Sequence, residues 1–332
     1  MNAITIQDVV ATVAKDDKGK WDVSAPICNL QMDRRGYLYR EKKSKGHLAI
    51  TDHALRQLCQ RVIPNRGGTY VSNTPVHLRQ LNLNYALKER RENALVRGKG
   101  LYIRAVLSDN FAPYDNKHLM AALPPILSGL EDRGISHSIK KYYLDDQSFW
   151  IDVTFPSITR QDFGGLEGGI RIGNSEVGVR SITCWSLVWR QVCSNGLMSW
   201  GKGQQLLKKV HRGKFKPEDV SEELATAITN SIESSDDLMD KLAASASEAV
   251  PDIESVIARI VKRRNLSQEF AGAMMAAMVK EPDHYSSLFG LVNAMTQASK
   301  LYQGTRRVEI EQEASRLLNW REDEIYSQVM VR

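Results

Sequence analysis

The spacing of apolar residues changes twice along this chain of 332 residues, and this change is the strongest constraint on its fold. Apolar residues recur at helical spacing over 51–63 and 74–93. From Gly98 to about residue 190 the spacing falls to two, as in strands, and from about residue 204 it returns to that of helices. The order predicts an α+β fold: an antiparallel sheet with flanking helices in the front part, followed by an all-helical C-terminal region.

Local signals place some elements more closely. Thr51 or Asp52 is a candidate cap for the first helix, and Pro64 ends it. The segments IKKYYL and SFWIDVTF flank residues 145–147, which predicts a β-hairpin. Alternation from Val177 to Trp185 fits a further strand, and a helix over 117–130 is expected to be interrupted by Pro124 and Pro125. In the C-terminal region, methionines at helical spacing (274, 275 and 278) predict core filling.

Charge is distributed unevenly. Residues 217–332 hold 12 Lys and Arg and 20 Asp and Glu, a formal charge of −8, which leaves 33 basic and 19 acidic residues, or +14, in the first 216. We therefore divide the chain into an N-terminal lead-in (1–30), a basic α+β body (31–216) and an acidic helical region for oligomer or partner contacts (217–332). A basic body predicts a polyanionic partner: nucleic acid, an anionic membrane or an acidic protein. Neutralisation of the basic body by the acidic region in an oligomer is the alternative.

Several classes of protein are not expected. No run approaches about 18 apolar residues, and the N-terminus lacks the pattern of a signal peptide, which predicts neither a membrane span nor export. The four cysteines include no C-x-x-C pair, as in a reduced cytoplasmic protein. No histidine or cysteine pattern predicts a metal site, and no cofactor is expected.

Two possible catalytic sites have weak support. Gly196–Gly203 contains the G-x-x-x-x-G-K core of a phosphate-binding loop, but Gly203 stands where Mg²⁺ needs a hydroxyl. This argues against nucleotide hydrolysis. Acidic residues of the body could serve a metal-dependent nuclease, although their spacing matches no motif. They are Asp109, Asp115, Asp152, Asp162 and Glu176.

The remaining signal is a repeated association of basic and aromatic residues. Lys and Arg neutralise phosphates, and aromatic rings stack on unpaired bases, a combination that favours single-stranded over duplex nucleic acid. The predicted phosphate contacts are Arg34, Arg35, Lys42, Lys43, Lys99, Arg104, Lys140, Lys141, Lys202, Lys208 and Lys209. The predicted stacking residues are Tyr102, Tyr143 and Trp200.

Three sequence blocks resemble a family of phage and plasmid proteins of unknown function. The blocks are R-A-x-L-S-D with a following D-N (Arg104 to Asn116), N-S-E-V-G (174–178) and C-x-N-G (193–196). Phe111 stands where this family usually has Tyr. For Asn174, Ser175 and Glu176 we favour a tight bend whose side chains bond backbone groups between strands over a turn beside nucleic acid.

The order of elements is also similar to that of phage single-strand annealing proteins of the Redβ, RecT and Erf kind. That resemblance implies a single-stranded-DNA-binding protein of a bacterial host's cytoplasm. It would assemble into a ring or filament, anneal strands without ATP and meet a host or phage recombination partner through its acidic region. Two alternatives stay open. Cleavage of plasmid DNA with Mg²⁺ or Mn²⁺ would reveal a nuclease. Pull-down after nuclease treatment would reveal a non-enzymatic inhibitor that binds a host protein.

Overall fold

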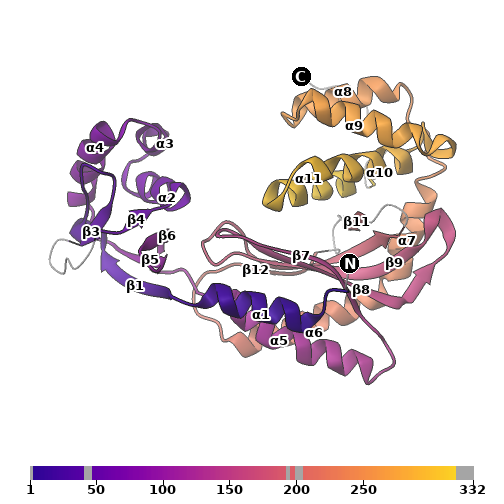
Figure 1. Cartoon of the computed structure of the whole chain (residues 1–332), viewed down its shortest axis with the longest axis horizontal. Coiled ribbons are helices and arrows are strands. Elements are labelled where there is room, and N and C mark those ends of the chain that lie inside the picture. Colours follow the sequence, from indigo (N-terminus) through magenta and orange to yellow (C-terminus); the bar gives the residue numbers. More distant parts are fainter. Residues whose placement is uncertain (1–2, 41–46, 192–194, 199–204, 319–332) are drawn as a thin grey trace.

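The computed structural model describes residues 3–40, 47–191, 195–198 and 205–318. It has a mixed α+β fold with mainly antiparallel sheets, which confirms the predicted fold class. Figure 1 shows two lobes: a small lobe formed by residues 20–108, and a large lobe built on a long sheet with helices on both faces.

The small lobe is a four-stranded sheet covered by three helices. Its elements are β1 (Lys20–Pro26), β2 (Leu30–Met32), β3 (Leu38–Arg40), β4 (Ala49–Ile50), α2 (Asp52–Val62), α3 (Gly67–Ser72), α4 (Val76–Lys88), β5 (Asn93–Lys99) and β6 (Tyr102–Ser108). The sheet has the order β1-β5-β6-β4, and β2 and β3 form a separate ribbon. Thr51 caps α2 by accepting from the Ala54 amide, and the apolar face of α2 packs on the core of this lobe, as its spacing predicts.

The large lobe contains a six-stranded antiparallel sheet. Its strands are β7 (Ser138–Leu144), β8 (Phe149–Arg160), β9 (Leu166–Asn174), β10 (Ile182–Arg190), β11 (Asn195–Met198) and β12 (Gln205–Lys209). Their order is β11-β10-β9-β8-β7, with β12 also paired to β10. The β7–β8 hairpin is the predicted one, and Asp145 closes its turn by accepting from the amides of Gln147 and Ser148.

Helices cover both faces of this sheet. They are α1 (Ile6–Asp17), α5 (Asn116–Glu131), α6 (Pro217–Glu233), α7 (Ser235–Ala244), α8 (Ile253–Arg263), α9 (Gln268–Val279), α10 (Leu288–Ala298) and α11 (Gly304–Leu317). In Figure 1, α1, α5 and α6 lie on one face and α8 to α11 lie on the other. α6 shares a core with the sheet although it belongs to the acidic region, so the change of charge at residue 217 is not a boundary in packing.

The N-terminal segment is an integral part of the fold rather than a lead-in. A capping box between Thr5 and Asp8 begins α1, and Val9 and Val13 of α1 are fully buried against α5 and the sheet. β1 then pairs with β5 along its whole length. The sequence did not predict α1 or β1. In β1 the apolar pattern is weak, because Ala25 is its only buried residue.

Three local expectations are corrected. Residues 205–209 form a strand, not the start of a helix, because they pair with β10. Val177 and Val179 lie in the turn before β10, which begins only at Ile182. α5 continues through Pro124 and Pro125, because its apolar face packs without a break on α1 and α6.

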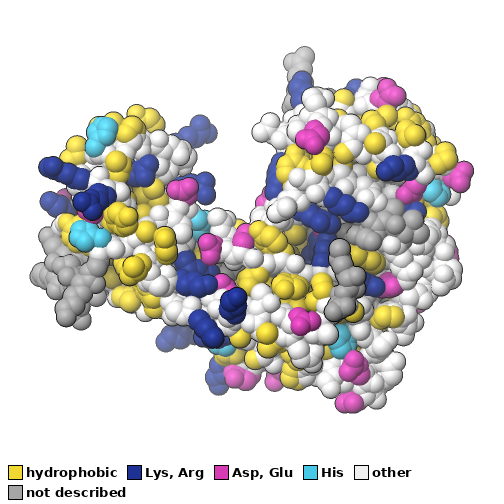
Figure 2. Space-filling model, in the orientation of Figure 1, with side chains coloured by type: hydrophobic (Ala, Val, Ile, Leu, Met, Phe, Trp, Pro, Cys, Tyr) yellow, Lys and Arg dark blue, Asp and Glu magenta, His cyan; other side chains and the backbone are white. Residues whose placement is uncertain are grey.

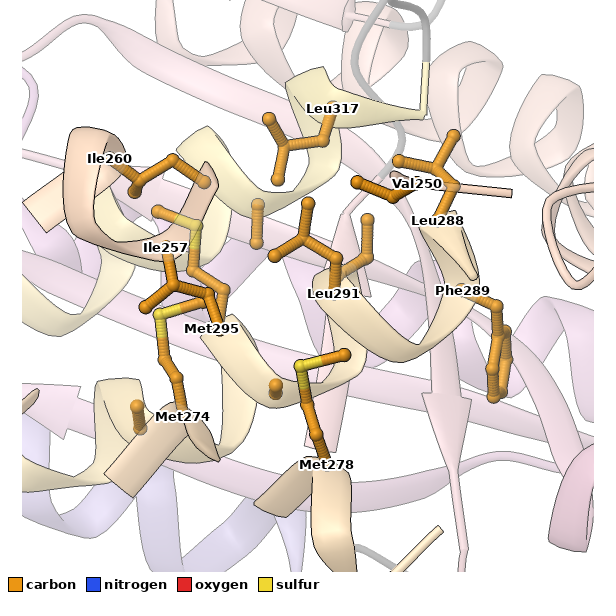
Figure 3. Packing of buried hydrophobic residues seen from close by; sticks show 14 of the residues in the cluster. Val250, Ile257, Ile260, Met274, Met278, Leu288, Phe289, Leu291, Met295 and Leu317 are labelled. Carbon is orange, nitrogen blue, oxygen red and sulfur yellow. The ribbon is translucent and has the colours of Figure 1, made fainter. Parts of the chain in front are cut away.

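The C-terminal helices form a core of their own. Met274 and Met278 of α9 are buried in it together with Ile257 of α8 and Met295 of α10 (Figure 3), which confirms the predicted core role of these methionines. Within the described ranges, no helix has the length and apolar character to cross a membrane.

Candidate nucleic-acid interface

The predicted phosphate contact Arg104 is buried and already neutralised. Its side chain is 6% exposed, and its guanidinium donates to the Glu176 carboxylate at 2.9 Å. An arginine enclosed in this way has no access to a phosphate. Arg104 is therefore part of the framework, and its assignment to the interface is wrong.

Four further predicted lysines form ion pairs inside the molecule. Lys99 lies 2.6 Å from Asp16 Oδ1, and Lys140 lies 2.7 Å from Glu167 Oε2. Lys209 pairs with Glu223, and Lys141 is shared between Asp152 and Glu311. These cations neutralise carboxylates of their own chain, so we remove them from the interface.

The other predicted residues fall into three groups. Arg34, Arg35, Tyr102 and Lys208 are exposed. Tyr143 is half-buried and donates to Asp145 Oδ2 at 2.6 Å, which ties it to its own hairpin rather than to a base. Lys42, Lys43, Trp200 and Lys202 lie outside the described residues.

The first two sequence blocks meet in one buried polar network. Asn174 donates to the carbonyl of Tyr114 and to Asn116 Oδ1, while its own Oδ1 lies 3.0 Å from His211 Nε2. Ser175 donates to the carbonyl of Gln147. These side chains bond backbone and side-chain groups between elements, which confirms the structural interpretation of the N-S-E block.

Glu176 is the charged centre of this network and joins the two lobes. Its carboxylate lies 2.7 Å from Lys20 Nζ of β1 and 2.9 Å from Arg104 of β6, and it accepts from the Asn116 amide at the start of α5. Burial alone would raise the pKa of Glu176, but the charges of Lys20 and Arg104 outweigh burial and lower it. The carboxylate is therefore ionised in the fold.

Three of the acidic residues considered for a nuclease are each paired with an arginine. Asp115 pairs with Arg97, Asp152 with Arg171 and Asp162 with Arg160. Among the residues that the structure describes, no three His, Cys, Asp or Glu side chains are grouped to hold a metal ion.

Positive charge is concentrated in the small lobe. Residues 20–108 hold 17 Lys and Arg against 6 Asp and Glu, or +11, while the other residues hold 28 against 33, or −5. On the face shown in Figure 2, Lys and Arg side chains surround this lobe and acidic side chains are few there. Six exposed cations of the lobe form no ion pair within the described part of the chain: Arg34, Arg35, Arg56, Arg66, Lys88 and Arg91.

Exposed aromatic and apolar side chains accompany these cations. Tyr85 of α4 is 76% exposed and Tyr70 of α3 is 72% exposed. Leu78 and Leu81 continue the exposed face of α4, because residues three or four apart lie on one side of a helix. An uncovered face of this kind on a basic lobe has the features of a binding surface.

Hydrogen bonds hold the three helices together as one surface. Gln60 of α2 donates to Thr69 of α3, and Arg79 of α4 donates to the carbonyl of Thr74 at 2.8 Å. Arg90 donates twice to the carbonyl of Val62, which joins the ends of α4 and α2. We call the exposed residues Arg56, Arg66, Tyr70, Leu78, Leu81, Tyr85, Lys88 and Arg91 the small-lobe surface.

Part of this surface is visible in the sequence. The segment 74–93 has a basic face in the helical projection, and it includes Lys88 and Arg91. Tyr70 and Tyr85 were missed because neither stands directly beside a cation in the chain. The fold brings them to the cations of neighbouring turns and helices.

Comparison with models of known protein families gave no match, and neither did searches among curated proteins and solved structures.

Proposed function

We propose that this protein binds single-stranded nucleic acid, in the first place DNA, through the small-lobe surface. The observation that carries the proposal is the excess charge of +11 in residues 20–108, next to exposed tyrosines. Cations attract the phosphate backbone, and this attraction depends on salt but little on sequence. Tyrosine rings give unpaired bases a stacking surface that duplex DNA does not use.

Neutralising cations of the small-lobe surface should weaken binding and flatten its salt dependence. In the triple variant Arg66→Gln/Lys88→Gln/Arg91→Gln, we expect the affinity for a 30-nucleotide single strand at low salt to fall about tenfold or more. The slope of log affinity against log salt should decrease by about 2, because each lost phosphate contact removes about 0.7. Fluorescence anisotropy at 50–200 mM salt measures both quantities.

A matched variant separates local contact from net charge. Lys241, Lys262 and Arg263 are exposed on α7 and α8 and form no ion pair in the described ranges. Their triple substitution by Gln removes the same charge and should change affinity less than about twofold. Equal losses in both triples, or an unmodified protein that does not bind, would reject the proposal.

Removing an exposed ring should reveal stacking. Tyr85→Ala and Tyr70→Ala should each cost about 1–3 kcal/mol of binding to a single strand, since this is the usual range for base–aromatic stacking. Tyr85→Phe keeps the ring and should bind nearly as well as the unmodified protein. Affinity for a duplex of the same length should not respond to either alanine change, and a parallel loss there would contradict stacking on bases.

We further propose that binding serves annealing of complementary strands without ATP, by homo-oligomers that hold a strand extended. The resemblance to phage annealing proteins supports this step. The acidic region at 217–332 stays the proposed contact for an oligomer or a recombination partner. In a fluorescence-quenching assay, two complementary strands are mixed with and without the protein, and no nucleotide is added. The protein should speed duplex formation. Binding without acceleration would limit the function to strand protection.

A further inference from the structure

A pocket of about 340 Å³ lies in the large lobe, between the sheet and the start of α11. It is separate from the small-lobe surface, and it contains none of that surface's residues. Its walls come from β7, β8 and β9 on one side and from the segment 300–308 on the other. Pockets for small molecules begin at about 300 Å³, so this one fits a compact ligand.

The pocket is lined by more positive than negative charge. Lys141, Arg171, Lys300 and Arg307 face it, against the single carboxylate of Asp152. Arg171 is saturated, because it donates twice to Asp152 at 2.6 Å and once to Glu311. Glu311 also accepts from Arg307 Nε at 2.9 Å. With Glu311 counted, four cations stand beside two carboxylates, which is an excess of two positive charges.

Lys141 is most affected by this excess. Its Nζ lies 3.2 Å from Glu311 and 3.5 Å from Asp152, yet burial and the charge of Arg171 together lower its pKa. An anion in the pocket would favour the charged form of Lys141 and relieve its repulsion by Arg171.

α11 begins at the wall of the pocket. Gln303 precedes the helix without a side-chain cap, so the first amides of α11 lack that partner. Gly304 has φ of +58°, and a Cβ there would lie 2.3 Å from Tyr143 Oη. Only glycine allows the helix to start this close to the hairpin. The positive end of the α11 dipole thus adds to the charge of the lining cations.

Trp150 adds an unpartnered hydrogen-bond donor to the residues that line the pocket. Its side chain lines the pocket and is 3% exposed, and its buried Nε1–H has no hydrogen-bond partner among the residues that the structure describes. The edge of the indole at Cζ3 lies over Gly173 of β9, and Nε1 is at the opposite end of the ring system. A buried donor without an acceptor costs free energy, and a bound polar ligand would remove that cost.

We propose that this pocket binds a nucleoside monophosphate, with its phosphate held by Arg307, Lys141 and the start of α11. Tyr302, which is half-buried at the pocket wall, provides an aromatic surface for the base. The volume accepts one ring system and one phosphate rather than a dinucleotide. The same chemistry exists in a free mononucleotide and at the 5′-phosphorylated end of a strand.

Calorimetry with AMP, adenosine and inorganic phosphate tests the proposal. AMP should bind, and adenosine and phosphate should each bind at least about tenfold more weakly, because each lacks one half of the recognised group. A 5′-phosphorylated oligonucleotide that competes with AMP, while its 5′-hydroxyl form does not, identifies a strand end as the source. Absence of AMP binding at millimolar concentration, or phosphate that binds as tightly as AMP, overturns the proposal.

Neighbouring arginines of α11 provide a matched pair of variants. Arg307→Gln should weaken AMP binding about tenfold or more, whereas Arg306→Gln should change it less than about twofold, because Arg306 pairs with Glu309 outside the pocket. Circular dichroism confirms that each variant folds, and Lys300→Gln replaces Arg307→Gln if that variant does not. If Arg306→Gln weakens AMP binding as much as Arg307→Gln or its replacement does, the assignment of the phosphate site is wrong.

Discussion

Replacing Arg171 by Met should lower the free energy of unfolding by about 3–5 kcal/mol, because it leaves two buried carboxylates without their main partner. Arg171 is fully buried, and Asp152 and Glu311, which it bridges, have side chains 1% and 2% exposed. Glu311 belongs to α11 and Asp152 to the sheet, so the same change loosens the C-terminal helices from the sheet. Urea unfolding at pH 7 measures the loss.

The difference in free energy of unfolding between Arg171→Met and the unmodified protein should become smaller in acid. Burial would raise the pKa of Glu311, but the charges of Arg171, Lys141 and Arg307 outweigh burial and lower it to about 2. A carboxyl with a lowered pKa in the fold stabilises the protein fully above its ordinary value of 4.5, and this contribution is lost as the pH falls towards 2. The gap between the variant and the unmodified protein should therefore shrink between pH 4.5 and 2.

The control for this prediction lies on the same helix. Arg306→Met removes an exposed pair with Glu309, for which we expect about 0–1 kcal/mol. A loss from Arg171→Met as small as that, or a gap that does not depend on pH, would show that the buried cluster contributes little to stability.

Arg171 is buried and paired with residues far away in the chain, whereas Arg306 is exposed and paired within its own helix. This contrast explains which features of the molecule the sequence could predict. Local patterns were sufficient for α2, for the β7–β8 hairpin and for the buried faces of α8 and α9, because spacing and caps act within a few residues. Partners of charged residues are not local. Arg171 and Glu311 are 140 residues apart, and Arg104 and Glu176 are 72 apart.

For that reason the sequence could not show which cations of the predicted interface are available to a ligand. A lysine beside a tyrosine in the sequence does not show whether the lysine is free or already paired, and Lys99, Lys140 and Lys141 are paired. The net charge of each lobe is a better guide to unpaired charge than single lysines are, because each ion pair within a lobe contributes zero to the sum. Once the fold defines residues 20–108 as a lobe, their charge of +11 supports the proposal that this lobe carries the binding surface.

Glu176→Gln should destabilise the protein by about 3 kcal/mol without changing the affinity of the folded protein for a single strand. Gln keeps the size of the side chain but removes the countercharge of Arg104 and one of the two carboxylates beside Lys20, which keeps Asp16 at 2.7 Å, and both cations are largely enclosed. Because these cations come from the small lobe and Asn116 from the large one, the loss should appear as weaker coupling of the two lobes. Thermal unfolding and hydrogen exchange at the junction measure it.

Asp109→Asn is the matched change for comparison, because Asp109 is exposed in a turn and its carboxylate contacts only Ser108 among the described residues. It should leave stability within about 0.5 kcal/mol of the unmodified protein. A well-folded Glu176→Gln variant that no longer binds the oligonucleotide would instead place Glu176 at the interface. The geometry argues against that outcome, since the carboxylate is enclosed by Lys20, Arg104 and the Asn116 amide and has no open side towards a strand.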